Sequence, residues 1–220
     1  MIIAIDGPSG TGKSSVSRAV ATQLGAKYLD TGAMYRIATL HVLRGGIDPA
    51  DATAVIERTA DVPLQVSDDP ADTRVFLAGD DVSAEIRGPE VTAAVSAVSA
   101  IPEVRENLVA QQRRIAKEAG DIVMEGRDIG TVVLVDAPTK VYLDARPEVR
   151  AQRRHDQNLA AGKQSDYDTV LADVIRRDER DSSRKASPLR PAEDATIIDT
   201  SDLTMDEVIA AVINAYQEGK

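Results

Sequence analysis

Residues 2–15 read IIAIDGPSGTGKSS, and the order of residue types in this stretch decides the fold. The apolar run Ile2 to Ile5 is typical of a parallel strand that is buried on both faces. A glycine-rich segment follows at once, and residues 13–24 then show a helical pattern. Within that segment the spacing G-x-x-x-x-G-K-[ST] is met by Gly7, Gly12, Lys13 and Ser14. The stretch therefore predicts a strand, a tight phosphate-binding loop and a helix.

Each fixed residue of this loop has a physical task. Glycines permit unusual backbone angles and a close approach to a ligand. Backbone N–H groups of the loop, and the positive N-terminus of the helix, attract phosphate oxygens. Lys13 would reach the β- and γ-phosphates, and the Ser14 hydroxyl would coordinate Mg²⁺. We therefore expect a nucleoside triphosphate with Mg²⁺. The alternative is an ordinary glycine-rich turn with a surface lysine.

The composition limits the possible classes of protein. The chain has 220 residues, of which 43% are hydrophobic and 28% charged, as in a soluble protein with one sizeable core. Aromatic residues make up only 3%, so the core must be aliphatic. The formal net charge of −10 disfavours binding to polynucleotides and to anionic membranes. The absence of cysteine excludes disulfides, thiolate metal sites and thiol nucleophiles.

We also expect a cytoplasmic location. No apolar run approaches the roughly 20 residues of a membrane span. The N-terminal residues MIIAID have no basic start and reach Asp6 after five residues, unlike a signal peptide.

Strand and helix patterns alternate along the rest of the chain. Short apolar runs predict strands at 122–124, 141–143 and 196–198. An arginine-rich helix is expected over 148–159. A closing helix is expected after Thr204, with Glu207 three residues on as in a capping box. This alternation predicts an α/β fold with a parallel sheet.

Two regions interrupt the alternation. In residues 61–88, Leu64/Val66 and Val75/Leu77 flank a DDPAD turn, which predicts an antiparallel hairpin in an inserted subdomain. Residues 155–168 are polar and predict a mobile loop. An insertion and a basic loop suit an enzyme that closes over its substrate.

Two motifs suggest where a second ligand binds. In YLDTGAMYR (28–36), Thr31 can cap a helix that carries Arg36, and a hydroxyl with an arginine also suits a phosphate. In IVMEGRDIGTVV (122–133), glycines flank Arg127 and Asp128 at the carboxyl end of a strand, where ligands bind in parallel sheets. Glu125 stands where a carboxylate would direct Mg²⁺ through water. The alternative for Arg127 and Asp128 is a surface salt bridge.

The stretch RRDERDSSRK (176–185) is the densest charge cluster. If it is helical, Arg176, Arg180 and Arg184 share one face, with Arg177 and Asp181 on an adjacent one. For an isolated run, a solvated helix with salt bridges is the simpler interpretation. Three more arginines precede the polar stretch: Arg150, Arg153 and Arg154. Together these cations favour a lid that supplies positive charge to a transferring phosphoryl group.

These motifs together resemble the nucleoside monophosphate kinases, and among them the bacterial cytidylate kinases. GPSGTGKS, LDTGAMYR, VSAVSAIPEVR, EGRDIGTVV and RRDERDSSR occur in the family's order and cover nearly the whole chain. The phosphate loop alone is unspecific, whereas DTGAMYR with EGRDIGT separates this family from adenylate and guanylate kinases. The family often has Ser where Thr31 stands, and a bulkier polar residue within DSSR. The hydroxyl and the Asp181–Arg184 spacing are both retained.

The resemblance implies a three-layer α/β/α P-loop NTPase core with a parallel sheet. The core would comprise about 1–40, 107–147 and 186–220. The monophosphate-binding insert, with a small antiparallel sheet, would comprise about 41–106, and the helical lid about 148–185. The implied reaction transfers the γ-phosphoryl group of ATP to CMP or dCMP, giving ADP and CDP or dCDP. The implied protein is a monomer that binds these nucleotides and neither a nucleic acid polymer nor a membrane.

The resemblance also implies site residues. The ATP phosphates would bind along Gly7, Pro8, Ser9, Gly10, Thr11, Gly12, Lys13, Ser14 and Ser15. The CMP residues would be Thr31, Arg36, Ser96, Arg105, Arg127, Asp128, Asp181 and Arg184. The catalytic cations would be Lys13, Arg127, Arg177 and Arg184. Mg²⁺ would be held by Ser14 and, through water, by Glu125.

Within this set Asp128 would accept a hydrogen bond from the exocyclic amine of cytosine. The carbonyl of uracil would be repelled there, so CMP is preferred over UMP. Asp181 would hold the sugar hydroxyls, and Arg184 would lie near the base or a phosphate. Alternatives remain. They are another small-acceptor kinase, for a different nucleotide or shikimate, and a nucleotide-dependent switch without phosphoryl transfer. A kinase for polynucleotide ends is disfavoured by the acidic charge.

Overall fold

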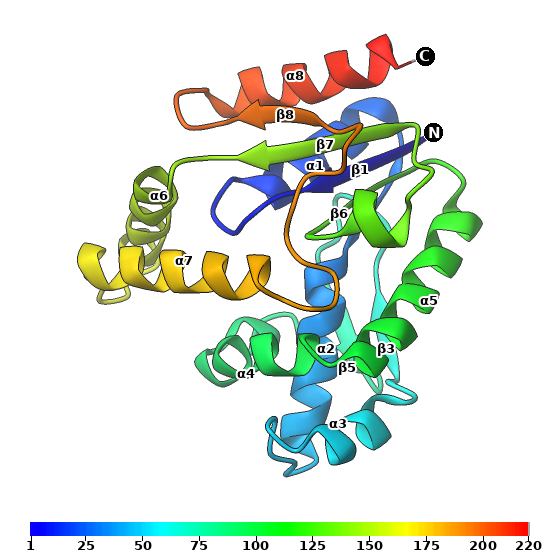
Figure 1. Ribbon diagram of the computed structural model, residues 1–220, viewed down its shortest axis with the longest axis vertical. Coiled ribbons are helices and arrows are strands. Elements are labelled where there is room, and N and C mark those ends of the chain that lie inside the picture. The colour runs from blue at the N-terminus through cyan, green and yellow to red at the C-terminus, as the bar shows by residue number, and fades with distance from the viewer. Residues whose placement is uncertain (220) are drawn as a thin grey trace. The chain divides into compact units, whose positions relative to one another are not determined.

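A computed structural model describes residues 1–219 (Figure 1). Its five-stranded sheet has the order β2-β6-β1-β7-β8, and a separate sheet has the order β3-β4-β5. The strands of the larger sheet are β1 (Ile2–Asp6), β2 (Lys27–Asp30), β6 (Ile122–Gly126), β7 (Thr139–Asp144) and β8 (Thr196–Asp199). With its flanking helices, this arrangement confirms the predicted α/β P-loop NTPase fold.

The chain divides into two compact units. One comprises Met1–Ile2 and Ala21–Met124, and the other comprises Ile3–Val20 and the chain from Glu125 onward. Within residues 1–219, none of the helices has the length and apolar character needed to cross a bilayer.

The unit that contains the phosphate loop is built on parallel strands. β1 pairs with β7 and β7 pairs with β8, both in parallel, with Ile5 opposite Val141 and Leu143 opposite Ile198. Its helices are α1 (Lys13–Leu24), α6 (Pro147–Ala160), α7 (Tyr167–Ser182) and α8 (Met205–Glu218). Only the first eight residues of α1 belong to this unit. Helices α6 and α7 pack against each other, and α8 packs on β7 and β8 (Figure 1). The predicted helix over 13–24 is confirmed at both ends.

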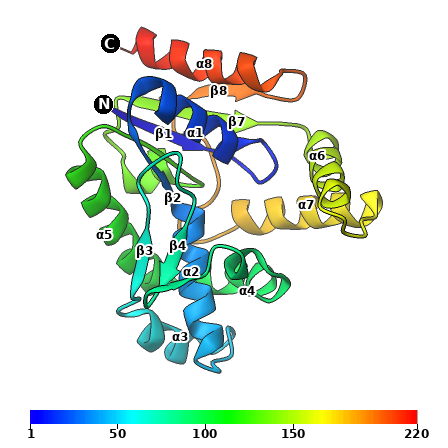
Figure 2. The same cartoon turned by 180° about the vertical axis from the view of Figure 1, so that it is seen from behind.

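The other unit contains the small sheet. β3 (Leu64–Val66) pairs antiparallel with β4 (Val75–Leu77), and β4 pairs with β5 (Asp80–Asp81), so the predicted hairpin is confirmed (Figure 2). The helical elements are α2 (Thr31–Arg44), α3 (Ala52–Thr59), a 3₁₀ turn (Glu85–Arg87), α4 (Pro89–Ser99) and α5 (Pro102–Ala119). α2 is apolar on most sides and packs against α3, α4 and β4, as expected for a helix inside a core.

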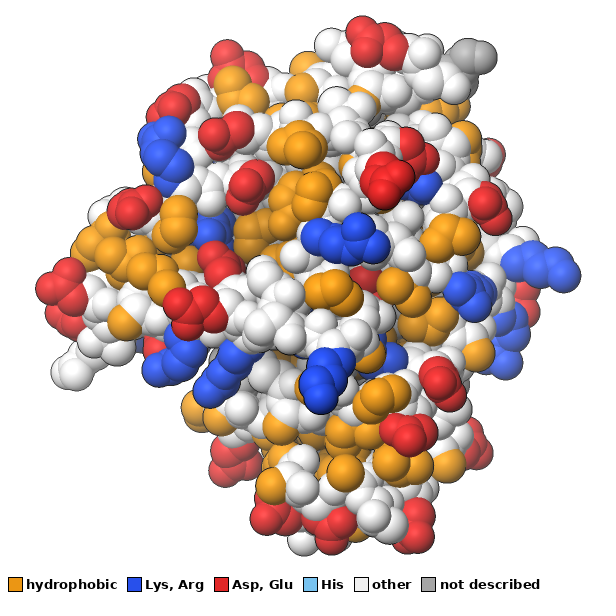
Figure 3. Space-filling view, viewed as in Figure 1, with side chains coloured by type: hydrophobic (Ala, Val, Ile, Leu, Met, Phe, Trp, Pro, Cys, Tyr) orange, Lys and Arg blue, Asp and Glu red, His pale blue; other side chains and the backbone are white. Residues whose placement is uncertain are grey.

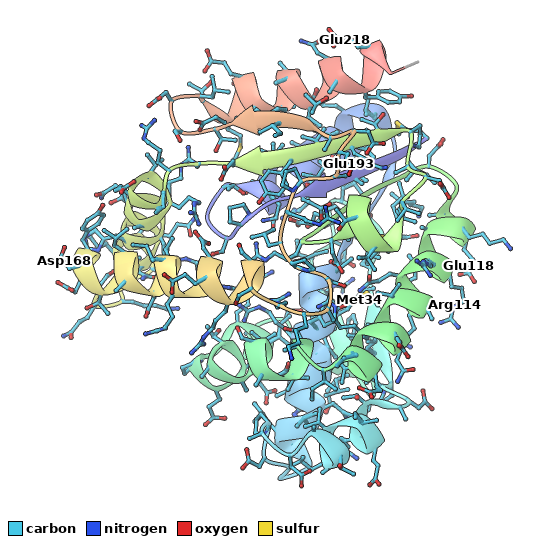
Figure 4. The ribbon with its side chains drawn as sticks, in the orientation of Figure 1. Met34, Arg114, Glu118, Asp168, Glu193 and Glu218 are labelled. Atoms are coloured by element: carbon cyan, nitrogen blue, oxygen red, sulfur yellow. The ribbon has the colours of Figure 1, made fainter. Side chains whose placement is uncertain are left out.

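The core is aliphatic, as the scarcity of aromatic residues predicts. The largest fully buried side chains are Ile, Leu and Met, among them Ile5 on β1 and Met34 on α2. Helix α5 has the two-faced pattern of a surface helix. Its residues Leu108 and Ala116 are buried, while Arg114 and Glu118 project outward (Figure 4).

Two local expectations need correction. The loop expected over 155–168 is shorter, because α6 continues to Ala160 and α7 begins at Tyr167. His155 Nδ1 lies 2.9 Å from Ser165 Oγ, and Asp166 caps α7 by accepting from Thr169 N, so side chains at both helix ends define the turn. Strand β2 was not predicted, since its four residues, KYLD, offer only two buried apolar side chains.

The start of α8 allows a stability test. Thr204 accepts from the N–H of Glu207 at 3.3 Å, and the Glu207 carboxylate accepts from the N–H of Thr204 at 2.8 Å, which is the predicted capping box. We expect Thr204→Ala to lower the free energy of unfolding by about 1 kcal/mol in a urea titration. Thr204→Ser keeps the hydroxyl and is the control. Equal stability of the two variants would contradict the assignment.

Candidate functional site

The phosphate loop depends on glycine at its first position. Gly7 has φ +149°, and a Cβ atom there would lie 2.0 Å from the carbonyl oxygen of Leu143 on β7. Any side chain would push the loop away from the sheet. Gly10 and Gly12 have φ of +83° and +84°, a region that residues with a Cβ rarely adopt. The motif's glycines thus have the backbone conformation that the sequence predicted for them.

The carbonyl oxygens of the loop are hydrogen-bonded to donors of the same unit. Arg127 Nη1 donates to Gly7 O at 2.6 Å, and Lys13 Nζ donates to Pro8 O at 2.8 Å. Arg150 Nη1 donates to Ser9 O at 3.2 Å. A carbonyl oxygen that accepts from a cationic donor has its partial negative charge offset, so it repels an anion less. The loop is therefore arranged so that phosphate meets N–H groups and cations.

A buried carboxylate holds two of the cations beside this loop. Arg127 Nε lies 2.9 Å from Asp181 Oδ2, and Arg184 pairs with the other oxygen of Asp181. Asp181 is only 2% exposed. Glu125 and Asp128, at the end of β6 and just beyond it, are buried as well. Lys13 interacts electrostatically with Glu125, Arg127 and Arg177, so the loop, the end of β6 and α7 contribute to one charged cluster.

Lys13 is affected by this cluster. Burial lowers the pKa of its ammonium group, and the nearby positive charge of Arg127 lowers it further, while Glu125 and Asp6 oppose the shift. An amine with a lowered pKa gains strongly from an approaching anion, because the anion stabilises the protonated form. The ammonium group of Lys13 should therefore be stabilised when a phosphate binds beside it.

Asp6 is a site residue that the sequence analysis missed. Its carboxylate accepts from the N–H groups of Ile129 and Gly130, each at 2.8 Å. Burial raises the pKa of this carboxyl to about 6, and its two backbone hydrogen bonds oppose the increase. The available signal was a carboxylate that ends a buried strand directly before a phosphate loop.

The arginines expected to form a cationic lid have different surroundings. Arg150 is buried and donates to Ala145 O at 2.8 Å and to Asp178 at 3.0 Å as well as to the loop. Arg176 pairs with Asp173 on the exposed side of α7, as in the salt-bridge interpretation. The shared face proposed for Arg184 is wrong, because α7 ends at Ser182 and Arg184 lies beyond it.

The remaining predicted residues lie in the other unit. Arg105 on α5 is 4% exposed, lies 4.9 Å above the ring of Tyr35, and donates to Ser99 O at 2.9 Å. Arg36 on α2 donates to Ile86 O at 2.9 Å and to Thr92 Oγ1 at 3.0 Å. Two arginines are thus held by defined acceptors near α2 and α4.

The cap of α2 also differs from the expectation. Asp30, and not Thr31, is the N-cap, because its carboxylate accepts from the N–H of Ala33 at 3.1 Å. Thr31 is the first helical residue and is buried. Ser96 is a half-buried residue of α4, and its carbonyl accepts from Ser99 Oγ at 3.4 Å.

Residues 3–218 match the cytidylate kinase family. The chain belongs to the cytidylate kinase family. A protein named cytidylate kinase from Corynebacterium efficiens is 70% identical over 213 residues, which cover 97% of this chain and 93% of the relative. Another, from Corynebacterium glutamicum, is 69% identical over 99% of this chain and 94% of its own length.

A more distant relative agrees with this placement, and a solved structure shares the fold. The protein named cytidylate kinase from Rhodococcus opacus is 62% identical over 99% of this chain and 95% of its own length. A crystal structure of an uncharacterized protein from Eubacterium ventriosum covers 100% of this chain and 99% of its own, with a TM-score of 0.55 at 14% identity. This last similarity concerns the fold alone.

The environment of Lys13 in this family member predicts proton uptake on nucleotide binding. Its pKa lies below the ordinary value in the free protein, and the phosphates of ATP should raise it. Calorimetric titration with a non-hydrolysable ATP analogue, in two buffers of different ionisation enthalpy, should show a net uptake of protons at slightly alkaline pH. Lys13→Arg is the control, since guanidinium keeps its proton. Equal uptake by both proteins would contradict the assignment.

Proposed function

We propose that this chain transfers the γ-phosphoryl group of ATP to CMP or dCMP, giving ADP and CDP or dCDP. Its membership in the cytidylate kinase family supports this reaction. The observation that carries the proposal is the charged cluster at the phosphate loop, in which Arg127 binds both the Gly7 carbonyl and the buried Asp181. Phosphoryl transfer depends mainly on positioned cations, and this cluster supplies them.

The proposed donor side consists of residues 7–15 with Lys13 at the β- and γ-phosphates. Arg127, Arg177 and Arg184 would stabilise the charge on the transferring group. They can do so with little rearrangement, because the buried carboxylate of Asp181 already holds both Arg127 and Arg184. Arg177 acts on Lys13 electrostatically, which supports its place near the transferring phosphoryl group.

Mg²⁺ is the proposed metal, and the donor set fits it. Among residues 1–219 there is no group of three or more acidic or histidine side chains able to hold a metal alone. Mg²⁺ usually binds through one or two protein oxygens together with water and substrate phosphates. The Ser14 hydroxyl and the buried Glu125 carboxylate, acting through water, are oxygen donors of this kind. When bound, the metal neutralises negative charge on the phosphates.

The proposed acceptor side uses Thr31, Arg36, Ser96, Arg105 and Asp128. Arg105 is fixed by Tyr35 and by the Ser99 carbonyl, which supports a role in binding a planar base or its phosphate. Asp181 would bind the sugar hydroxyls. Because its oxygens already bind Arg127 and Arg184, the sugar would share these oxygens with the arginines.

We propose the core as 1–40, 107–147 and 186–220, the monophosphate-binding insert as 41–106 and the lid as 148–185. The proposed protein is a cytoplasmic monomer that acts on small nucleotides, with no membrane partner. Figure 3 shows both acidic and basic side chains on the face that it draws. Together with the net charge of −10, this supports a small acceptor over a polynucleotide end.

A panel of acceptors at fixed ATP tests the reaction. Initial rates of ADP release should be highest with CMP or dCMP, lower with UMP, and lowest with AMP, GMP and shikimate. Lys13→Ala should lose turnover by roughly two or more orders of magnitude, because its charge acts on the transferring phosphoryl group. Lys117→Ala, on the exposed side of α5, is the control. ATP binding without acceptor-stimulated ADP release would favour a nucleotide-dependent switch instead.

The cytosine preference is tested at Asp128. Asp128→Asn replaces an acceptor-only group by an amide that also donates, so UMP is no longer repelled. We expect the ratio of kcat/KM for CMP to that for UMP to fall roughly tenfold or more. Asp136→Asn, at an exposed position nearby in the sequence, is the control. An unchanged ratio would remove Asp128 from base recognition.

A further inference from the structure

Asp6, the last residue of β1, is a buried carboxylate to which the proposed reaction assigns no role. Its Oδ1 accepts a hydrogen bond from the N–H of Ile129, and its Oδ2 accepts one from the N–H of Gly130, each at 2.8 Å. The side chain is 3% exposed. A single carboxylate thus binds two consecutive amides of a segment that lies 123 residues away in the sequence.

These two amides begin an uncommon turn. Ile129–Val133 form a π-helical turn, and the carbonyl of Asp128 accepts from the N–H groups of Val132 at 2.9 Å and Val133 at 3.1 Å. The first amides of a helix have no acceptor within the helix, and π turns occur often at functional sites. Asp6 supplies acceptors for the first two amides, so the start of the turn depends on its carboxylate.

Asp128 lies directly before this turn, and the end of β1 holds the chain on both sides of it. On the N-terminal side, Arg127 Nη1 donates to the carbonyl of Gly7 at 2.6 Å. On the C-terminal side, Asp6 binds the next two amides. Two adjacent residues of one strand end therefore fix the neighbours of Asp128, whose own side chain is buried.

The charge of Asp6 is costly, which indicates that a carboxylate is needed here. Burial raises its pKa to about 6, and the nearby charge of Asp128 adds to this increase, while the two amides and Lys13 oppose it. An asparagine of the same shape would avoid the cost of burying a charge. Its side chain, however, accepts with one atom and donates with the other, so it could satisfy only one of the two amides.

We propose that Asp6 is a positioning residue for the acceptor nucleotide, which fixes Asp128 against the base by holding the amides of Ile129 and Gly130. This inference rests on the acceptor role proposed for Asp128. Asp6 itself does not touch either nucleotide. The competing interpretation is that Asp6 acts as a counter-charge for Lys13 and thereby affects ATP.

Asp6→Asn separates these two interpretations. We expect KM for CMP to rise roughly ten- to a hundredfold and the preference for CMP over UMP to fall, while KM for ATP is unchanged. Asp144→Asn is the matched control and should leave KM for CMP, the preference for CMP over UMP, and KM for ATP unchanged. Asp144 also ends a strand, β7, and accepts from the N–H of Ala145 at 2.9 Å, but it is exposed.

A double-mutant cycle with Asp128→Asn gives a second measurement. If Asp6 acts through Asp128, the effect of Asp6→Asn on the CMP-to-UMP ratio disappears when Asp128 is already replaced. Additive effects overturn the inference, and so does a rise of KM for ATP alone. If Asp6→Asn does not fold, as judged by circular dichroism, Asp6→Glu replaces it. That variant keeps the charge but displaces the carboxylate by one methylene, and an unchanged KM for CMP in the folded variant overturns the inference.

Failure of the proposed function is visible separately, in the acceptor panel of the wild-type protein. If the wild type prefers another acceptor, the cytosine assignment is wrong. Asp6→Asn should then raise KM for that preferred acceptor and leave KM for ATP unchanged. If the wild type prefers CMP and folded Asp6→Asn has an unchanged KM for CMP, the positioning role is overturned while the proposed function stands.

Discussion

The negative charge of nucleotide phosphates is the constraint around which the loop between β1 and α1 is arranged. Backbone carbonyls in such a tight loop would oppose an anion, and here the oxygens of Gly7, Pro8 and Ser9 accept from Arg127, Lys13 and Arg150. These cations therefore offset the partial negative charge of the loop's carbonyl oxygens. A site fixed in this way needs little reorganisation when charge moves during a reaction.

The burial of these charged side chains lowers the free energy of unfolding. Glu125, Asp128, Asp181 and Asp6 are all buried, and buried ion pairs commonly contribute little net stability because both partners lose their hydration. For Asp6 the effect of pH on stability follows from its pKa, which burial raises to about 6 in the folded state. Its contribution to the free energy of unfolding is therefore complete only at acidic pH, below the ordinary pKa of Asp, and is lost as the pH rises through about 6. The aliphatic core must supply the compensating stability.

Local patterns in the sequence were sufficient to predict local structure. The helix over 13–24, the capping box at Thr204 and the hairpin within residues 61–88 each depend on residues close together in the chain. The errors also had local causes. Asp30 and Thr31 are both good capping residues in adjacent positions, and only the backbone angles select Asp30.

The contacts that organise the site could not be read from spacing. The hydrogen bonds that the Ile129 N–H donates to Asp6 and that Arg127 donates to Gly7 each join residues at least 120 positions apart. The periodicity of apolar residues carries no information about contacts between residues so far apart in the chain. The family resemblance identified only some of the residues that make these contacts. It included Arg127 and Gly7 but not Asp6, whose only signal in the sequence is its place between a buried strand and the phosphate loop.

The buried side chain of Arg150 has a mechanical consequence. One guanidinium group binds the Ser9 carbonyl in the phosphate loop, the Ala145 carbonyl before α6 and the Asp178 carboxylate on α7. A displacement of α7 greater than the length of a hydrogen bond must either break the ion pair between Arg150 and Asp178 or displace the Ser9 peptide. Helix α7 and the phosphate loop are therefore mechanically linked, and strain applied to one is transmitted to the other through the side chain of Arg150.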